Sequence, residues 1–290
     1  MLIVGGSGHL GGELVRLCVA AGHEVGATCH TRPGNDPGAR WLPLDVRSRE
    51  AVAAVFDGFR PEVTINTAYR STDWTATADG AAHVAVAAAR AGGRLVHVSS
   101  DAVFSGSAPS YDEACVPDPI SPYGAAKAAA ETAVRAVLPD AAIARTSLIL
   151  GRGESAHEAL VHSLVARPGS GVLFADDVRC PVHVSDLAAA LAEVAVRGCS
   201  GVLHVAGADA VSRYELGVLI ARRDGLDEDL LVAGSRVRAG VPGPLEVRLD
   251  CSATRRRLGT RLRGAREFLA EPAARHSAAP DGRTVRDTTS

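Results

Sequence analysis

One lysine occurs in this chain, among 31 basic residues, and it ends the segment Tyr123-Gly124-Ala125-Ala126-Lys127. Lysine carries a compact ammonium on a flexible stem, whereas arginine carries a broad planar fork, so the two are not interchangeable. A tyrosine four residues before a lysine shares its helix face, and a nearby ammonium lowers the pKa of a phenol. Tyr123 is therefore predicted to donate and accept a proton in carbonyl chemistry. The pattern alone is weak, and a surface lysine that happens to follow a tyrosine is the alternative.

A glycine-rich loop near the start of the chain predicts a dinucleotide site. Gly5, Gly8 and Gly11 are spaced three apart, and His9 and Leu10 open the helix that follows. Glycines let the backbone turn sharply and approach a pyrophosphate, while the helix N-terminus presents free N–H groups to the phosphates. The loop follows a strand and precedes a helix, which is the context that this motif requires.

The end of the second predicted strand indicates which dinucleotide is bound. NAD sites usually place an acid there for the ribose 2′-hydroxyl, whereas an arginine accommodates the 2′-phosphate of NADP. Here no acidic residue occurs between the end of that strand and Asp36, and Arg32 can bind a phosphate with two hydrogen bonds. The segment favours NADP over NAD, although Arg32 could equally be one of many solvated arginines.

Short apolar runs alternate with alanine-rich stretches in the first half of the chain, which is typical of a doubly wound α/β fold with a parallel sheet, the Rossmann fold. We predict strands at 2–4, 25–29, 41–44, 63–66, 95–99 and 141–146, and helices at 10–20, 48–56, 81–91 and 122–137. Residues 1–150 form the NADP-binding domain in this interpretation. Shorter elements predict a smaller C-terminal substrate lobe at 151–270, and 271–290 reads as a disordered tail.

Composition excludes several classes of protein. A net charge of −2 gives no electrostatic case for nucleic acid or an anionic membrane. The six cysteines are scattered without a Cys-x-x-Cys pair, which argues against zinc and against a disulfide framework. We expect no metal, no signal peptide and no membrane span, and a cytoplasmic location.

Three features in this order resemble the extended short-chain dehydrogenase/reductase family: the glycine loop, Ser99-Ser100-Asp101 after the fifth strand, and Tyr123-x-x-x-Lys127. Within that family the chain is similar to the branch of dTDP-4-dehydrorhamnose reductase. The segments that carry this likeness include Asn66-Thr67-Ala68, Ser121-Pro122-Tyr123-Gly124, Arg145-Thr146-Ser147 and Arg179-Cys180-Pro181-Val182-His183. The resemblance covers nearly the whole chain except the tail, and it specifies the superfamily better than the substrate.

The resemblance implies a role for each matching residue. Ser100 would hydrogen-bond the substrate carbonyl, Tyr123 would transfer the proton, and Lys127 would bond the nicotinamide ribose and lower the pKa of Tyr123. The residues that line the cofactor would be Asn66, Thr67 and Ala68 after the fourth strand, with Asp45 and Val46 beside the adenine. These roles are physically consistent, because the negative charge that grows on a carbonyl oxygen during hydride transfer needs donors already in place.

The sequence leaves the substrate open. We expect NADPH-dependent reduction of a 4-keto-6-deoxy nucleotide sugar or a similar carbonyl, with Tyr69 and Arg179 in contact with the substrate. Leu148 and Leu150 stand where the rhamnose reductases usually have aromatic side chains, which leaves a more apolar wall. Members of the family often form homodimers, and the oligomeric state of this chain stays open.

Two other functions remain open. One is an epimerase or dehydratase that retains NAD, although Asp101 is followed by Ala102 and not by the glutamate of the sugar dehydratases. The other is a non-catalytic NADP-binding protein that acts through a partner, since the branch also resembles the regulatory subunit of methionine adenosyltransferase.

Overall fold

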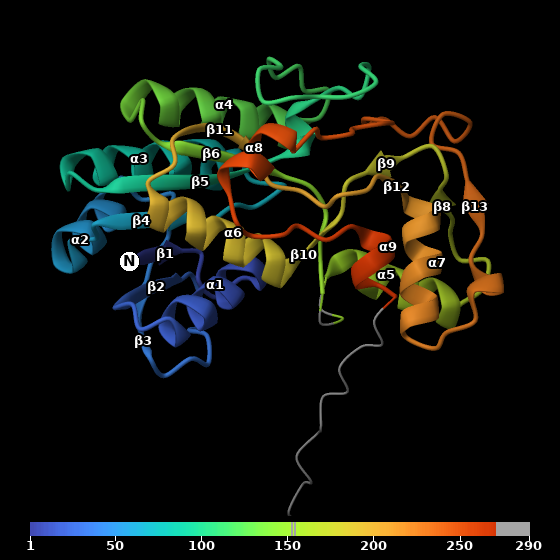
Figure 1. Ribbon diagram of the computed structural model, residues 1–290, viewed down its shortest axis with the longest axis horizontal. Coiled ribbons are helices and arrows are strands. Elements are labelled where there is room, and N and C mark those ends of the chain that lie inside the picture. Colours follow the sequence, from blue (N-terminus) through green and yellow to red (C-terminus); the bar gives the residue numbers. More distant parts are fainter. Residues whose placement is uncertain (152, 154, 271–290) are drawn as a thin grey trace, which may run out of the picture.

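A seven-stranded parallel sheet forms the centre of the computed structural model, which describes residues 1–151, 153 and 155–270 (Figure 1). The strand order is β11-β6-β5-β4-β1-β2-β3, with bounds Gly201–His204, Ala142–Thr146, Arg94–Ser100, Val63–Asn66, Leu2–Val4, Val25–Cys29 and Ala39–Pro43. Strand β1 pairs with β2 on one side and β4 on the other. The order of strands reverses there, and in such sheets a ligand binds at this point, outside the carboxyl ends of the strands.

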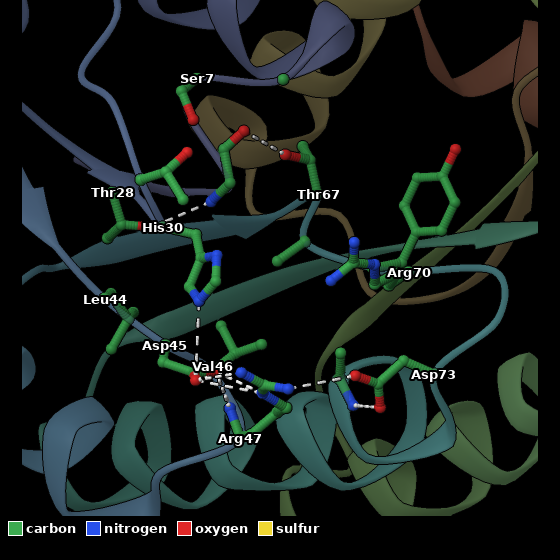
Figure 2. A pocket seen from close by; sticks show the side chains of 16 residues that line it. Ser7, Thr28, His30, Leu44, Asp45, Val46, Arg47, Thr67, Arg70 and Asp73 are labelled. Carbon is green, nitrogen blue, oxygen red and sulfur yellow. Dashed lines mark hydrogen bonds and ion pairs between the residues drawn. The ribbon is translucent and has the colours of Figure 1, made fainter.

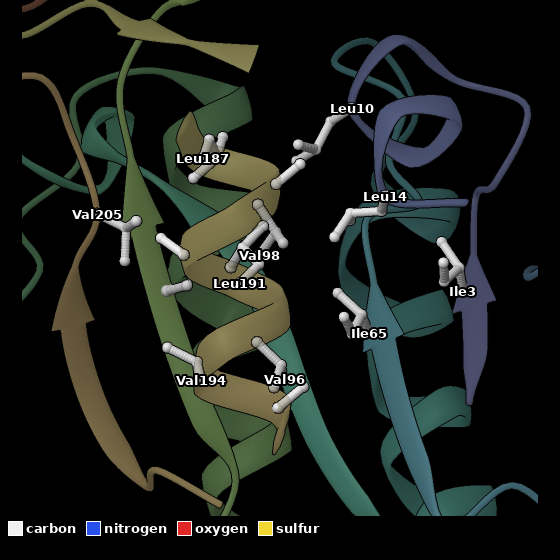
Figure 3. Close-up of a cluster of buried hydrophobic side chains, with 14 of the residues drawn as sticks. Ile3, Leu10, Leu14, Ile65, Val96, Val98, Leu187, Leu191, Val194 and Val205 are labelled. Atoms are coloured by element: carbon white, nitrogen blue, oxygen red, sulfur yellow. The ribbon is translucent and has the colours of Figure 1, made fainter. Parts of the chain in front are cut away.

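Helices cover both faces of the sheet, which is why its strands are apolar on both sides. One face carries α2 (Arg49–Phe59), α3 (Gly80–Arg90) and α4 (Pro122–Val137), and the other carries α1 (His9–Ala20) and α6 (Val184–Arg197) (Figure 1). Figure 3 shows the core under α1 and α6, where strand side chains meet Leu187 and Leu191. Each fully buried aliphatic side chain there contributes about 1.5–3 kcal/mol.

Serine caps fix where two of these helices begin. The Ser48 hydroxyl accepts a hydrogen bond from the amide of Ala51 at 3.1 Å at the start of α2. The Ser121 hydroxyl does the same for the amide of Gly124 at 3.1 Å at the start of α4, just before Pro122. The second cap places the first turn of α4, with its tyrosine, at the carboxyl edge of the sheet.

The C-terminal half adds a smaller layer beside the sheet. Its core lies between α5 (Ala156–Ala166) and α7 (Arg213–Arg223), and includes Val161, Leu216 and Ile220. The short elements elsewhere are η1 (Thr75–Asp79), η2 (Asp101–Val103), η3 (Glu228–Leu230), β7 (Ile149–Leu150), β8 (Leu173–Phe174), β9 (Val178–Arg179), β10 (Val182–His183), β12 (Val211–Ser212), β13 (Ala233–Gly234), α8 (Ser252–Arg257) and α9 (Ala265–Phe268).

The predicted fold class is confirmed, with one correction to its extent. The elements α6 and β11 lie in the part of the chain assigned to the second lobe, yet β11 extends the central sheet beside β6, and α6 packs on the sheet with α1. The division at residue 150 otherwise stays a prediction, and the predicted disordered tail lies outside the described residues. Within the described part of the chain, no helix is long and apolar enough to span a membrane.

Candidate active site

Two adjoining cavities run along the carboxyl edge of the sheet. The first, of about 430 Å³, lies at the ends of β2 and β3, and the second, of about 610 Å³, lies at the ends of β5 and β6 and reaches the C-terminal lobe. Both are lined by Gly5, Gly8, Thr67 and Tyr69, so they form one continuous groove across the switch point. A groove made of two joined cavities suits an extended ligand with two halves.

The glycine loop forms the floor of this groove. Gly5 has a φ of +83°, and a Cβ there would lie 2.8 Å from Oγ1 of Thr67. A Cβ on Gly11 would lie only 2.1 Å from the carbonyl oxygen of Gly5, because the first turn of α1 packs directly on the loop. No acidic side chain occurs in that turn, so the N-terminus of α1 can attract an anion.

The predicted catalytic residues meet in the second cavity. Ser100 ends β5, while Tyr123 and Lys127 project from α4, and all three line the cavity. The rings of Tyr69 and Tyr123 lie 5.8 Å apart, and the Lys127 ammonium lies 4.8 Å above the Tyr69 ring. Parallel strands end at one edge of a sheet, and the capped helix α4 begins at that edge, which brings together residues distant in sequence.

Lys127 is almost fully buried, with 2% of its surface exposed. Its Nζ donates a hydrogen bond to the carbonyl oxygen of Val98 at 3.0 Å. Burial lowers the pKa of Lys127 to about 8, and the carboxylate of Glu131 opposes that shift. The ammonium is therefore still charged at neutral pH, but at a cost that an exposed lysine does not have.

The electrostatics of Tyr123 differ from the prediction. A lowered pKa was expected from the adjacent lysine, but burial raises the pKa of Tyr123 above its ordinary value, and the neighbouring Tyr69 adds to the rise. A hydrogen bond with Ser100 lowers it only in part. The expectation is wrong in direction because desolvation of the phenolate outweighs the other contributions. A phenol that is kept neutral in this way still carries the proton that it would donate.

Ser100 has a second, structural task. Its hydroxyl accepts the amide of Ala102 at 3.2 Å, which caps η2, and donates to Oδ1 of Asp101 at 3.2 Å. The other oxygen of Asp101 accepts the hydroxyl of Ser147 at 2.6 Å. The serine is thus held in place at the end of β5 by its own neighbours.

Most of the predicted cofactor residues line the groove. They are Gly5, Gly8, His9, Leu10, Gly11, Asp45, Val46, Thr67, Ala68, Tyr123 and Lys127. Asn66 does not, because it is buried and bonds His97 Nδ1 through Nδ2 at 3.3 Å and the amide of Ala68 through Oδ1 at 3.1 Å. It holds the strand end that carries the lining residues. Arg32 is exposed and outside the lining of both cavities, so its contact with a cofactor stays a prediction.

Besides the predicted Asp45, the wall of the first cavity carries charged residues that the sequence did not single out. Figure 2 shows Arg47 between Asp45 and Asp73, with His30 facing Asp45. Arg47 Nη2 lies 2.7 Å from Asp45 and Nη1 lies 3.5 Å from Asp73. The hydrogen bonds from Arg47 hold the pKa of Asp45 down to about 2. Nothing in the local sequence around Arg47 marks this pairing, since Asp73 is distant along the chain.

Arg179 lines the second cavity, as expected of a substrate contact, but its guanidinium is bonded within the protein. It donates to the carbonyl oxygens of Val178 and Pro244 at 2.7 and 2.8 Å, and it pairs with Asp177 at 2.8 Å. Only 5% of its surface is exposed. The residue is fitted to hold the cavity wall in shape, and direct contact with a substrate stays a prediction.

Two more arginines surround the same buried acid. Arg213 and Arg236 approach Asp177 at 3.5 and 2.6 Å, and both line the second cavity. With Arg179 and Asp101, this cluster contains three arginines and two acids, so its surplus charge is positive. Arg213 is the most exposed of the three, at 24% of its side chain. Among thirty arginines no sequence signal distinguished Arg213 and Arg236.

Comparison with known proteins adds to this geometry. The family model described as the RmlD substrate binding domain matches residues 1–277. A dTDP-4-dehydrorhamnose reductase from Mycobacterium tuberculosis is 30% identical over 261 residues, which cover 84% of this chain and 82% of that protein. A dTDP-4-keto-6-deoxy-D-glucose reductase from Streptomyces niveus is 32% identical over 244 residues, with 78% and 79% covered.

Among solved structures, the crystal structure of a dTDP-4-dehydrorhamnose reductase from Bacillus anthracis in complex with NADP has a TM-score of 0.77. It is 24% identical, and the alignment covers 92% of this chain and 96% of that chain. At this identity the likeness shows the fold. Within the described residues, no cluster of three or more histidine, cysteine or acidic side chains is arranged to hold a metal ion.

Proposed function

The chain belongs to the RmlD substrate-binding-domain family, and on that premise we propose that it is an NADPH-dependent reductase of a 4-keto-6-deoxy nucleotide sugar. The protein is thus an NAD(P)-dependent oxidoreductase of the short-chain dehydrogenase/reductase type. The observation that carries the proposal is the convergence of Ser100, Tyr123 and Lys127 in one cavity that continues into the glycine loop. Curated relatives at 30% and 32% identity bear the names of such reductases.

The groove fits a dinucleotide. The first cavity would take the adenosine half, beside Asp45 and Val46, and the second would take the nicotinamide half, beside Tyr123 and Lys127. The pyrophosphate would lie between them, where Gly5 and Gly11 leave no room for a Cβ and the N-terminus of α1 is free of acidic side chains. NADPH would supply the hydride that reduces the carbonyl carbon.

The end of β2 supports NADPH over NADH. It presents His30 and Thr31 to the first cavity instead of an acidic side chain, and an acid at that place would repel a 2′-phosphate. The relative of known structure from Bacillus anthracis was solved with NADP.

Ser100, Tyr123 and Lys127 would each have a different role in the reduction. Ser100 and Tyr123 offer two hydroxyl groups to the substrate oxygen, where negative charge grows as the carbonyl is reduced. Tyr123 gives up its proton to that oxygen, and its raised pKa means that it is protonated when the reaction begins. Lys127 lines the same cavity as Tyr123, and its positive charge would favour the phenolate that forms.

The positive cluster of Arg213 and Arg236 supports an anionic substrate. A nucleotide sugar carries a diphosphate, and arginines bind phosphate oxygens through paired hydrogen bonds. The cluster lies in the same cavity as the catalytic tyrosine, so one substrate can contact both. Leu148 and Ile149 also line the cavity and give the sugar an apolar wall.

The test is NADPH oxidation on dTDP-4-keto-6-deoxysugars, with NADH in parallel. Tyr123→Phe is expected to lower kcat by at least about 100-fold while NADPH affinity stays unchanged. Tyr111→Phe is the matched control, because it also removes one phenolic hydroxyl, but Tyr111 stacks on Phe104 at 4.1 Å and lines neither cavity. Full turnover in Tyr123→Phe would contradict the mechanism.

A further inference from the structure

A buried carboxylate lies beneath the catalytic cavity and joins three elements. Glu131 on α4 accepts the hydroxyl of Ser99 on β5 at 2.5 Å. It also accepts Arg145 on β6 in a two-pronged pairing, with Nη2 to Oε2 at 2.8 Å and Nε to Oε1 at 3.0 Å. The side chains of Glu131 and Arg145 are 3% and 2% exposed. Glu131 and Arg145 are not among the predicted site residues and line neither cavity, whereas Ser99 lines the second cavity.

Each residue of this cluster is close in sequence to a residue that lines the catalytic cavity. Ser99 immediately precedes Ser100 on β5, and Arg145 precedes the cavity residues Thr146 and Ser147. Glu131 follows Lys127 by four residues, so both lie on the same face of α4. The bonds from Glu131 to Ser99 and Arg145 therefore fix α4 relative to the end of β5.

The same carboxylate is the charge that favours protonation of the buried lysine. Glu131 raises the pKa of Lys127 against the effect of burial. From β5, His97 faces the lysine as a neutral ring, since burial lowers its pKa to about 3. From the loop after β4, Tyr69 presents its uncharged ring.

Within the described part of the chain, no other carboxylate on the elements packed against α4 contributes to the pKa of Lys127. On η1, Asp79 is exposed, and on η2, Asp101 bonds Ser100 and Ser147. On α3, His83 bonds the carbonyl oxygen of Val46, and Arg90 is exposed. On β6, Arg145 is a second cation, paired with Glu131.

We propose that Glu131, held by Ser99 and Arg145, is a positioning residue that keeps the Lys127 ammonium charged and sets it against Ser100 and Tyr123. This inference rests on the proposed function for its catalytic consequence. Its electrostatic half concerns the protein alone, so it can be tested without substrate or cofactor.

The single lysine makes a direct test possible. Protein labelled with ¹³C at lysine Cε, and produced without a lysine in any tag, gives one side-chain resonance, which belongs to Lys127. Its titration in the wild type is expected near pH 8. In Glu131→Gln the midpoint is expected to fall by about one unit or more, because the opposing charge is lost while Arg145 remains.

Glu158→Gln is the matched control. Glu158 is fully buried and pairs with Arg223 at 2.7 Å in the C-terminal lobe, so its loss also breaks a buried carboxylate–arginine pair. It lies on α5, away from Lys127, and the lysine midpoint is expected to match the wild type. An unchanged midpoint in Glu131→Gln, or an equal fall in Glu158→Gln, would overturn the proposal.

Should the single variant fail to fold, Glu131→Gln with Arg145→Met removes both charges and leaves no unpaired ion. The midpoint is then expected to fall by less than in the single variant, but still below the wild type. No fall would overturn the proposal.

A kinetic measurement separates the two claims. For an active wild type, Glu131→Gln is expected to lose about fivefold more kcat at pH 8 than at pH 6, because a fall of one unit from a midpoint near 8 lowers the charged fraction about fivefold at pH 8 and hardly at all at pH 6. A loss that does not depend on pH would overturn the catalytic half. A wild type without turnover would refute the proposed function, and the lysine titration would still decide the electrostatic half.

Discussion

Replacement of Lys127 by methionine is expected to stabilise the protein at neutral pH while it destroys activity. Methionine keeps most of the length and volume of the lysine stem but carries no charge. The lysine ammonium is buried and bonds one carbonyl oxygen, that of Val98. After the substitution Glu131 is still paired with Arg145, so no unpaired carboxylate is left behind.

The magnitude follows from the pKa of Lys127, which falls from 10.5 to about 8 on folding. At about 1.4 kcal/mol per pKa unit, burial of the charged form costs about 3 kcal/mol. The variant also loses the hydrogen bond to Val98, which offsets about 1 kcal/mol of this gain. We therefore expect the variant to be about 2 kcal/mol more stable than the wild type at pH 7. Between pH 8 and 10.5 the unfolded wild type binds more protons than the folded form, so wild-type stability rises with pH. Most of the difference should vanish by pH 10.

Urea denaturation of both proteins at pH 6, 7, 9 and 10 measures this difference. Groups other than Lys127 titrate in both proteins, so they cancel in the comparison. Between pH 6 and 7 the two stability curves are expected to run parallel, which is an internal control. A variant that is less stable than the wild type at pH 7, with a difference that does not change with pH, would refute the reasoning that the buried ammonium is desolvated.

Two further predictions concern the loop and the arginine cluster. Gly11→Ala is expected to weaken NADPH binding by more than about 100-fold, because the new Cβ would lie 2.1 Å from the carbonyl oxygen of Gly5. Gly12→Ala is the matched control. Its Cβ would lie 3.7 Å from the nearest atom, so the affinity for NADPH should change by less than about twofold. NADPH fluorescence titration measures both, and equal affinities would contradict the role of the loop. Arg213→Gln is expected to raise the KM for the sugar nucleotide by about tenfold, while Arg179→Gln should lower the free energy of unfolding by about 3 kcal/mol. Steady-state kinetics measure the KM, and urea denaturation measures the stability. A raised KM in the Arg179 variant and a loss of stability in the Arg213 variant would contradict this assignment.

The regular part of the fold was predictable because its patterns are local. The strands at 2–4, 25–29 and 63–66 and the helix at 122–137 have the predicted bounds, since buried parallel strands are continuous apolar runs and α4 begins with a serine cap and a proline. The two-residue strands of the C-terminal half were largely missed. Such strands have no periodicity, and each exists only because a distant segment pairs with it, as β9 does with β12.

The site divides in the same way. Ser100, Tyr123 and Lys127 could be predicted because each lies in a short motif, and the rule for parallel strands brings their ends together. The direction of the pKa shift of Tyr123 could not, because it depends on how much solvent the surrounding segments exclude. Arg213 and Arg236, which approach Asp177, were equally hidden, since the packing of the second lobe determines their partners.

The two buried cations on the α4 side of the sheet show why one position holds lysine in a chain that otherwise uses arginine. Arg145 has five N–H donors, and its surroundings offer two carboxylate oxygens of Glu131 and the carbonyl oxygen of Cys115 at 3.1 Å. The surroundings of Lys127 offer the single carbonyl of Val98 and an aromatic face. A guanidinium there would leave several donors unsatisfied and, because arginine does not deprotonate, could not relieve that cost by losing its charge. An ammonium satisfied by one protein acceptor has donors left for a bound ligand. The scarcity of acceptors around Lys127 therefore favours lysine on physical grounds and supports its place at the centre of the site.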